Sequence, residues 1–136
     1  MVEKNTKDVG PTDWQGRLTK AQRYRRSAEK LAYFDDGEDD ADGIMITVIQ
    51  SAIAYGDALT MKFKQKKGQD HQSQARLIKE ALGREASADQ VKRFGDILSS
   101  KSESAYGHRL IRLVDALAAV EQLKRVAMWA EGLLKV

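Results

Sequence analysis

The sequence predicts an all-α, single-domain protein, an up-and-down antiparallel bundle of about five helices. Apolar residues recur at helical spacing along most of the 136 residues, as is typical of amphipathic helices. Pro11 is the only proline, and β-branched residues do not alternate with polar ones as they do in strands. The linkers between the helical segments are short, which favours antiparallel neighbours.

The first helix is predicted from Asp13 to Phe34, after a polar leader, residues 1–12, that we expect to be disordered. Thr12 or Asp13 is the expected N-cap, because both side chains can accept a hydrogen bond from a free backbone N–H. One face carries the apolar residues expected to point inwards, which are Leu18, Ala21, Ala28 and Leu31.

The second helix starts near Asp42 and continues to the stop at residues 66–68. It is apolar on most sides, so we expect it to be central; the polar and small residues that interrupt 44–61 favour a buried helix over a membrane span. A glycine inside a helix costs about 1 kcal/mol relative to alanine, so Gly56 predicts a close crossing by another helix. Its neighbour Asp57 is either a buried capping or ion-pair group or a solvent-facing one.

Three further helices complete the predicted bundle. One runs from about Asp70 to Leu82 and ends at Gly83, as helices often do. The next is capped by Ser87. The last runs from roughly Glu103 to Leu134, and its inward-facing residues are Leu110, Leu113, Leu117, Val120, Leu123, Ala127 and Leu134.

Composition excludes several kinds of site. The chain has no cysteine, which rules out a disulfide framework, a Cys-ligated zinc site and thiol catalysis and fits a cytoplasmic protein. The N-terminus is polar, so we expect no signal peptide. His71 and His108 are the only histidines and are too few for a histidine metal site. We therefore expect no metal and no cofactor.

The acidic stretch Glu38–Gly43 is similar to the start of a calcium-binding EF-hand loop. Such a loop needs a bidentate carboxylate at its twelfth position, and that position here is Ile49. The alternative is that these carboxylates complement a helix N-terminus, and the sequence favours it.

Basic residues gather in two segments, although the formal net charge is only +3. Blocks of this kind can attract a polyanion, and the alternative is a solvated helix face. The candidate nucleic-acid-binding residues are Arg17, Lys20, Arg23 and Arg26. The second segment holds Lys62, Lys64, Lys66 and Lys67.

Several segments together resemble the HEPN superfamily (higher eukaryotes and prokaryotes nucleotide-binding domains). The resemblance covers about Asp13 to Leu134. It rests on residues 52–59, Gly68, His71, residues 75–79 and 97–106, and a long terminal helix with Asp115 and Ala116. It implies a HEPN-like bundle over residues 13–136 that is usually dimeric. Many members are metal-independent ribonucleases or toxin–antitoxin components, and others are non-catalytic.

The family's catalytic motif is an arginine, a polar residue, three to five further residues and a histidine. Here Lys101 stands in the arginine position and Ser102 is the polar residue, while either Tyr106 or His108 takes the histidine position. Lysine lacks the bidentate guanidinium fork, and tyrosine, with a pKa of about 10, is a poor general base near neutral pH. These four residues are the candidate catalytic set if the protein is a ribonuclease, and otherwise they fix a helix junction.

The sequence therefore predicts a non-catalytic HEPN-like binding or assembly module, in a toxin–antitoxin or nucleic-acid-associated setting. The second and last helices carry more apolar surface than one neighbour each can cover, and such a surplus often marks an interface. The expected partner is a second copy or another protein, with RNA as a further candidate and no membrane. The alternatives are a metal-independent ribonuclease with a degenerate Lys101/His108 site and a sequence-neutral nucleic-acid-binding protein.

Overall fold

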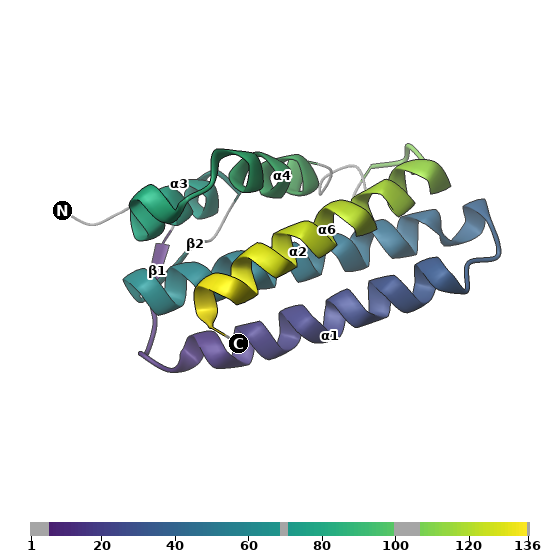
Figure 1. Ribbon diagram of the computed structural model, residues 1–136. Helices are drawn as coiled ribbons and strands as arrows, with labels where there is room; N and C mark the ends of the chain where they lie inside the picture. The colour runs from purple at the N-terminus through teal and green to yellow at the C-terminus, as the bar shows by residue number, and fades with distance from the viewer. Residues whose placement is uncertain (1–5, 69–70, 100–106, 136) are drawn as a thin grey trace.

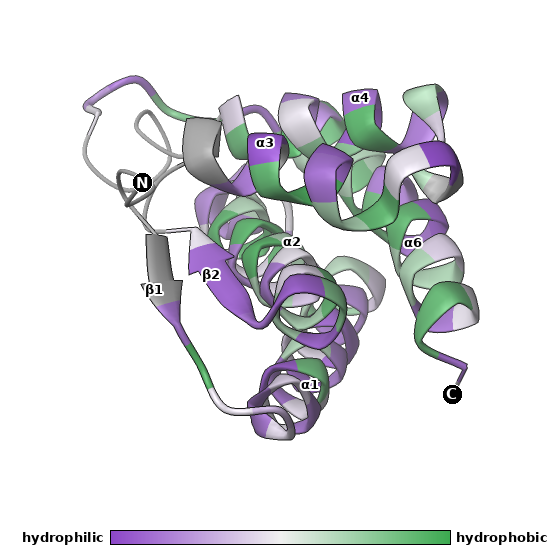
Figure 2. Cartoon of the chain, turned by 90° about the vertical axis from the view of Figure 1, so that its left-hand side faces the viewer, coloured by the Kyte–Doolittle hydropathy of each residue, from purple (hydrophilic) through white to green (hydrophobic). Residues whose placement is uncertain are grey.

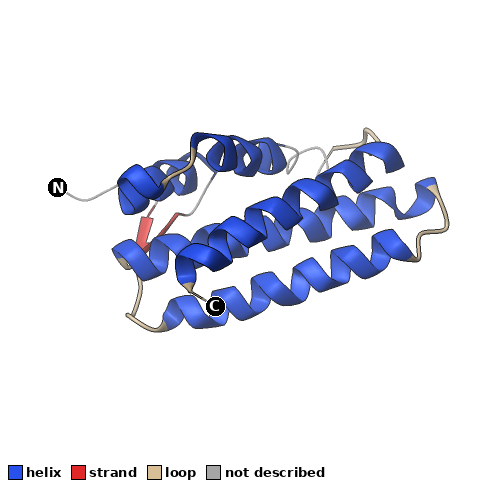
Figure 3. Ribbon diagram, viewed as in Figure 1, coloured by secondary structure: helices blue, strands red, loops and turns tan. Residues whose placement is uncertain are grey.

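The computed structural model describes residues 6–68, 71–99 and 107–135. Within these ranges it contains five α-helices and one pair of three-residue strands. Figure 3 shows that most of the described chain is helical. The predicted all-α, single-domain class is confirmed. Seen end-on, α2 (Ala41–Lys64) lies in the middle (Figure 2). Around it lie α1 (Asp13–Tyr33), α6 (Leu113–Leu134) and a row formed by α3 (His71–Leu82) and α4 (Ala88–Ser99).

Helix α1, Asp13–Tyr33, begins where the sequence predicts and ends one residue earlier. The Asp13 carboxylate accepts the Gly10 backbone N–H at 2.8 Å and so fixes the chain just before the helix. Leu18, Ala21 and Ala28 are buried as predicted. Leu31 is 41% exposed, so placing it in the core was wrong.

Helix α2, Ala41–Lys64, is the core helix and runs antiparallel to α1 (Figure 1). Most of its residues are buried because α1, α3, α4 and α6 all pack on it. By length and composition alone the stretch Glu38–Lys64 could cross a membrane, and it is the one such stretch among the described residues. Of its most apolar window, 78% is buried inside the fold.

Helices α3, His71–Leu82, and α4, Ala88–Ser99, lie in a row along one side of α2 (Figure 1). Gly83 ends α3 with a left-handed φ of 52°, a conformation that glycine adopts at little cost. A 3₁₀ turn, Gly83–Glu85, then leads to Ser87, whose hydroxyl accepts the Gln90 backbone N–H at 3.4 Å. Both predicted stop and start signals are confirmed.

Helix α6, Leu113–Leu134, begins later than predicted. Residues 107–112 are not helical, and Leu110, expected inside, is 80% exposed. The cause is distant in sequence: the carboxylate of Asp42 accepts the Ile111 N–H at 3.1 Å, and that of Glu38 accepts the Leu113 N–H at 2.7 Å. The acidic stretch therefore caps a helix, as predicted, but the helix is α6.

The strands β1, Thr6–Asp8, and β2, Lys66–Gly68, pair antiparallel with Thr6 opposite Gly68. The expectation that the whole leader is disordered is therefore wrong for residues 6–8. Gly68 is needed here, because a Cβ at this position would lie 2.7 Å from the backbone nitrogen of Gln74.

Candidate functional site

A buried carboxylate lies in the second half of α2. Asp57 is 3% exposed, and its Oδ2 lies 2.9 Å from Nη2 of Arg17 on α1. The Gln74 side chain on α3 donates from Nε2 to Asp57 Oδ1 at 2.7 Å and to the Ile53 carbonyl at 2.9 Å. The buried ion-pair alternative for Asp57 is therefore confirmed, and the carboxylate ties α1, α2 and α3 together.

Gly56 makes room for this arrangement. A Cβ on Gly56 would lie 2.5 Å from Cζ of Phe94 and 2.9 Å from the Gln74 side chain. The close crossing that the sequence predicts at Gly56 is thus confirmed, with α3 and α4 as the crossing helices.

Burial raises the pKa of Asp57 to about 6, although Arg17, Lys67 and Gln74 pull it in the opposite direction. A pKa near neutrality is common in catalytic acids and bases, but structural ion pairs also produce it. Here both carboxylate oxygens are held by protein side chains, so we interpret Asp57 as structural.

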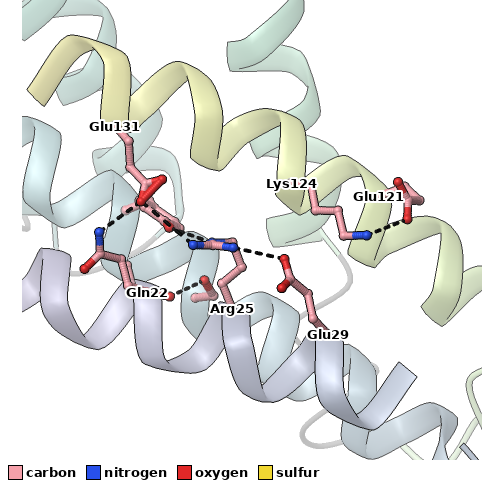
Figure 4. Close-up of polar contacts among 9 residues, drawn as sticks. Gln22, Arg25, Glu29, Glu121, Lys124 and Glu131 are labelled. Carbon is pink, nitrogen blue, oxygen red and sulfur yellow. Dashed lines mark hydrogen bonds and ion pairs between the residues drawn. The ribbon is translucent and has the colours of Figure 1, made fainter. Parts of the chain in front are cut away.

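A second polar network links α1, α2 and α6 (Figure 4). Arg25 donates from Nε to the hydroxyl of the buried Tyr55 and from Nη1 to Glu29, both at 3.0 Å. Glu131 on α6 accepts a 3.0 Å hydrogen bond from Gln22 and lies 3.9 Å from Arg25 Nη2. Burial raises the pKa of Tyr55, so its hydroxyl stays protonated and serves the packing of the three helices.

Beyond this network α1 and α6 leave an open groove of about 700 Å³ between them. Its floor is apolar, with Ala32, Leu117 and Val120, and charged side chains form its rim. The Lys124–Glu121 pair, at 3.0 Å, lies on its α6 side (Figure 4). The groove is lined by Arg26, Glu29, Lys30, Ala32, Tyr33, Phe34, Leu117, Val120, Glu121 and Lys124.

Large apolar side chains are exposed at the end of this groove. Tyr33 is 81% and Phe34 73% exposed, and their rings meet edge-to-face with centroids 4.7 Å apart. On α6, Val114 is 58% exposed and precedes the groove residue Leu117 by three positions, so the two are neighbours on the helix surface. An exposed cluster of this kind is typical of a surface that binds a partner.

The basic residues of α1 divide into an exposed group of four and an engaged pair, Arg17 and Arg25. Lys20, Arg23, Arg26 and Lys30 are exposed; their spacing of three, three and four residues places them on one side of the helix. We call these four residues the basic face, and none of them has an acidic partner within the described ranges. Arg17, the remaining predicted nucleic-acid contact, lies apart from this face and pairs with Asp57.

The predicted catalytic set is not brought together by the described residues. Lys101, Ser102 and Tyr106 lie outside them, and His108 is exposed in the non-helical segment before α6. Within the described part of the chain, no three His, Asp or Glu side chains gather as a metal site would need.

Sequence reasoning missed the exposure of Tyr33 and Phe34. The acidic run that follows them leaves no apolar segment nearby to cover either ring, and this run was the available signal.

No protein-family model matches the sequence, and no curated protein matches it either.

Proposed function

We propose that this chain is a non-catalytic, HEPN-like assembly module whose working surface is the open groove and the aromatic pair Tyr33–Phe34. The observation that carries the proposal is the exposure of these two aromatic side chains beside an apolar groove. Aromatic residues are the usual anchors of protein–protein interfaces. An amphipathic segment of a partner can lie in such a groove with its apolar side on the floor.

A second copy of the chain is the proposed first partner. The groove rim carries both cationic and anionic side chains, so an identical surface can offer it opposite charges. Closed two-fold pairing is also the commonest way in which soluble proteins assemble.

The ribonuclease alternative has less support. It needs a base beside a cation that holds phosphate, and the motif here offers Lys101 in place of the arginine, without its bidentate fork. Lys101 lies outside the described residues, and His108 is exposed in the irregular segment before α6. The expected result of an RNA-cleavage assay is no activity, and cleavage that is lost in His108→Ala would replace the assembly proposal.

Sedimentation equilibrium over micromolar to millimolar concentrations tests self-association. We expect a dimer for the native chain and a dissociation constant raised at least about tenfold, equivalent to about 1.4 kcal/mol, for Tyr33→Ser/Phe34→Ser. Met128→Ser is the matched control, since Met128 is 77% exposed on α6 and does not line the groove. A native chain that stays monomeric throughout would overturn the proposal.

A further inference from the structure

The surface around the aromatic pair has its charges in a definite order. The basic face lies before Tyr33 and Phe34 in the chain, and an acidic loop, residues 35–40, follows them directly. Along the chain, cations therefore precede the aromatic pair and acids follow it.

The acidic loop has free carboxylates as well as engaged ones. Asp35 accepts the Gly37 N–H, Asp40 accepts the Asp36 N–H and Glu38 caps α6. The side chains of Asp36 and Asp39 are exposed, and within the described residues neither has a cationic partner. The loop therefore presents two unpaired acids, as the basic face presents unpaired cations.

A two-fold axis converts this order into complementarity. In an isologous contact the same patch is used twice, so that residue i of one protomer meets residue j of the other and j meets i. With the aromatic pairs of two protomers packed on the axis, each basic face comes opposite the acidic loop of the other protomer. We infer that Arg23 and Arg26 pair with the partner's Asp36 and Asp39 in a two-fold homodimer. This inference rests on the proposed self-association.

The distances along the chain allow this pairing. Arg23 and Arg26 precede Phe34 by eleven and eight residues, which is roughly 16 and 12 Å of helix at 1.5 Å per residue. Asp36 and Asp39 follow it by two and five residues, which reach at most about 7 and 18 Å at about 3.6 Å per residue. Both acids therefore lie within about 18 Å of Phe34 along the chain, a range that also includes the two arginines.

A nucleic acid is the competing ligand of the basic face, and the acidic loop disfavours it. A strand that follows the basic face towards Phe34 next meets Asp36 and Asp39, which repel phosphate. The face itself extends only from Lys20 to Lys30, roughly 15 Å of helix. An anionic membrane is disfavoured because the apolar side of α1 is already buried in the core, whereas interfacial helices insert that side into lipid.

Charge exchange in the full chain tests the inference. We expect Arg23→Glu/Arg26→Glu and Asp36→Lys/Asp39→Lys, each on its own, to raise the dimer dissociation constant at least about tenfold, equivalent to about 1.4 kcal/mol. In each of these variants, like charges meet across the two-fold axis. Mixed in equal amounts, the two variants should recover native affinity as a heterodimer, because both sets of contacts again join opposite charges. Native mass spectrometry separates this heterodimer by mass, and a single chain that carries all four substitutions should recover the homodimer.

The control is Lys79→Glu/Arg84→Glu, which makes the same charge change at exposed positions of α3 and the following turn and should leave the dimer unchanged. Circular dichroism confirms that each variant is folded. A monomeric native chain would remove both the assembly proposal and this inference. If the native chain dimerises and both charge variants dimerise equally well, only the proposed pairing is overturned. The same holds if the mixed variants fail to form a heterodimer of native affinity. Fluorescence polarisation with a labelled oligonucleotide gives the remaining outcome: binding that Arg23→Glu/Arg26→Glu abolishes while the dimer stays intact would assign the basic face to nucleic acid.

Discussion

The two basic segments of this chain are both rich in cations but have different surroundings in the fold. Three of the four cations of the second segment are engaged where α2 meets β2 and the last residues of α6, which we call the closed end of the bundle. Lys62 donates to the Leu134 carbonyl at 3.1 Å and lies 4.7 Å from the Trp14 ring. Lys64 pairs with Glu80, and Lys66 lies 3.6 Å from Asp8.

The basic face of α1 lies along the outside of the helix and leads to the open groove. Its four cations have no acidic partner within the described ranges, and the aromatic pair beside them is exposed. A run of cations therefore does not by itself indicate a binding surface. What decides is whether the fold brings an acid or a carbonyl within reach of each one.

Arg17 and Arg23 are an engaged and an exposed cation on the same helix. Replacing each with methionine should produce the largest difference in the free energy of unfolding. Arg17→Met leaves the Asp57 carboxylate buried without its cation, and removing one partner of a buried pair costs about 3–5 kcal/mol. Arg23→Met removes an exposed cation and should change the free energy of unfolding by less than about 0.5 kcal/mol. Urea unfolding at pH 7 measures both.

The Arg17→Met penalty should shrink at pH 5, because Asp57 can then take up a proton and lose its charge. Equal costs for the two variants would mean that the Arg17–Asp57 pair contributes nothing and that the closed end is not held by its charges.

The pH dependence of stability gives the second prediction. Asp57 has a pKa of about 6 in the folded chain against an ordinary value of 3.8, so the folded state binds this proton more tightly than the unfolded state. Its contribution is fully present below about pH 4, is lost as the pH rises through 6 and is absent above. The difference corresponds to about 3 kcal/mol, at about 1.4 kcal/mol for each tenfold change in proton affinity.

Asp57→Asn cannot titrate and isolates this contribution. The native chain should lose about 2.5 kcal/mol relative to Asp57→Asn between pH 4 and pH 7, measured by urea unfolding at each pH. Asp39→Asn, at the exposed loop, should follow the native profile. A native-minus-variant difference that does not change with pH would show that Asp57 ionises normally.

Local signals were enough to predict most of the fold. Helices α1 to α4 follow from apolar periodicity and from signals that act within a few residues, such as Ser87 and Gly83. The start of α6 could not be predicted this way, because the carboxylates that hold its first residue and the segment before it come from Glu38 and Asp42, about seventy positions earlier in the chain. The β1–β2 pair was missed because three-residue strands of mostly charged residues carry no alternation.

The site was less accessible to prediction for a related reason. Whether a cation is free depends on contacts between distant segments, as the pairing of Arg17 with Asp57 forty residues later shows. Position on the helix gives a partial signal: Arg17 lies beside Leu18 and four residues before Ala21, at the margin of the buried stripe. Lys20, Arg23, Arg26 and Lys30 lie opposite that stripe, and their exposure could have been predicted from the helical repeat alone.

The smallest expected effect is a gain in the free energy of unfolding, and it comes from a substitution on the basic face. Arg26 has Arg23 three residues before it and Lys30 four residues after it, and like charges at these spacings destabilise a helix by about 0.2–0.5 kcal/mol per pair. Arg26→Glu converts both repulsions into attractions, with the glutamate on the favourable N-terminal side of Lys30. It also adds one repulsion, with Glu29 three residues after it, which offsets part of the gain. The new glutamate lies more than one turn from the end of α1, so the helix dipole opposes it little.

The isolated protomer should therefore gain about 0.5–1 kcal/mol of unfolding free energy from Arg26→Glu, while the two-fold dimer is weakened. Urea unfolding at a protein concentration well below the dimer dissociation constant measures the gain, and it should fade in high salt because exposed charges are screened. Ser27→Glu, one position away on the same exposed side, is the control for introducing a glutamate without removing a cation. A loss of more than about 1 kcal/mol in Arg26→Glu, a size that surface substitutions seldom reach, would mean that Arg26 has an internal partner and that the two basic segments are more alike than their contacts indicate.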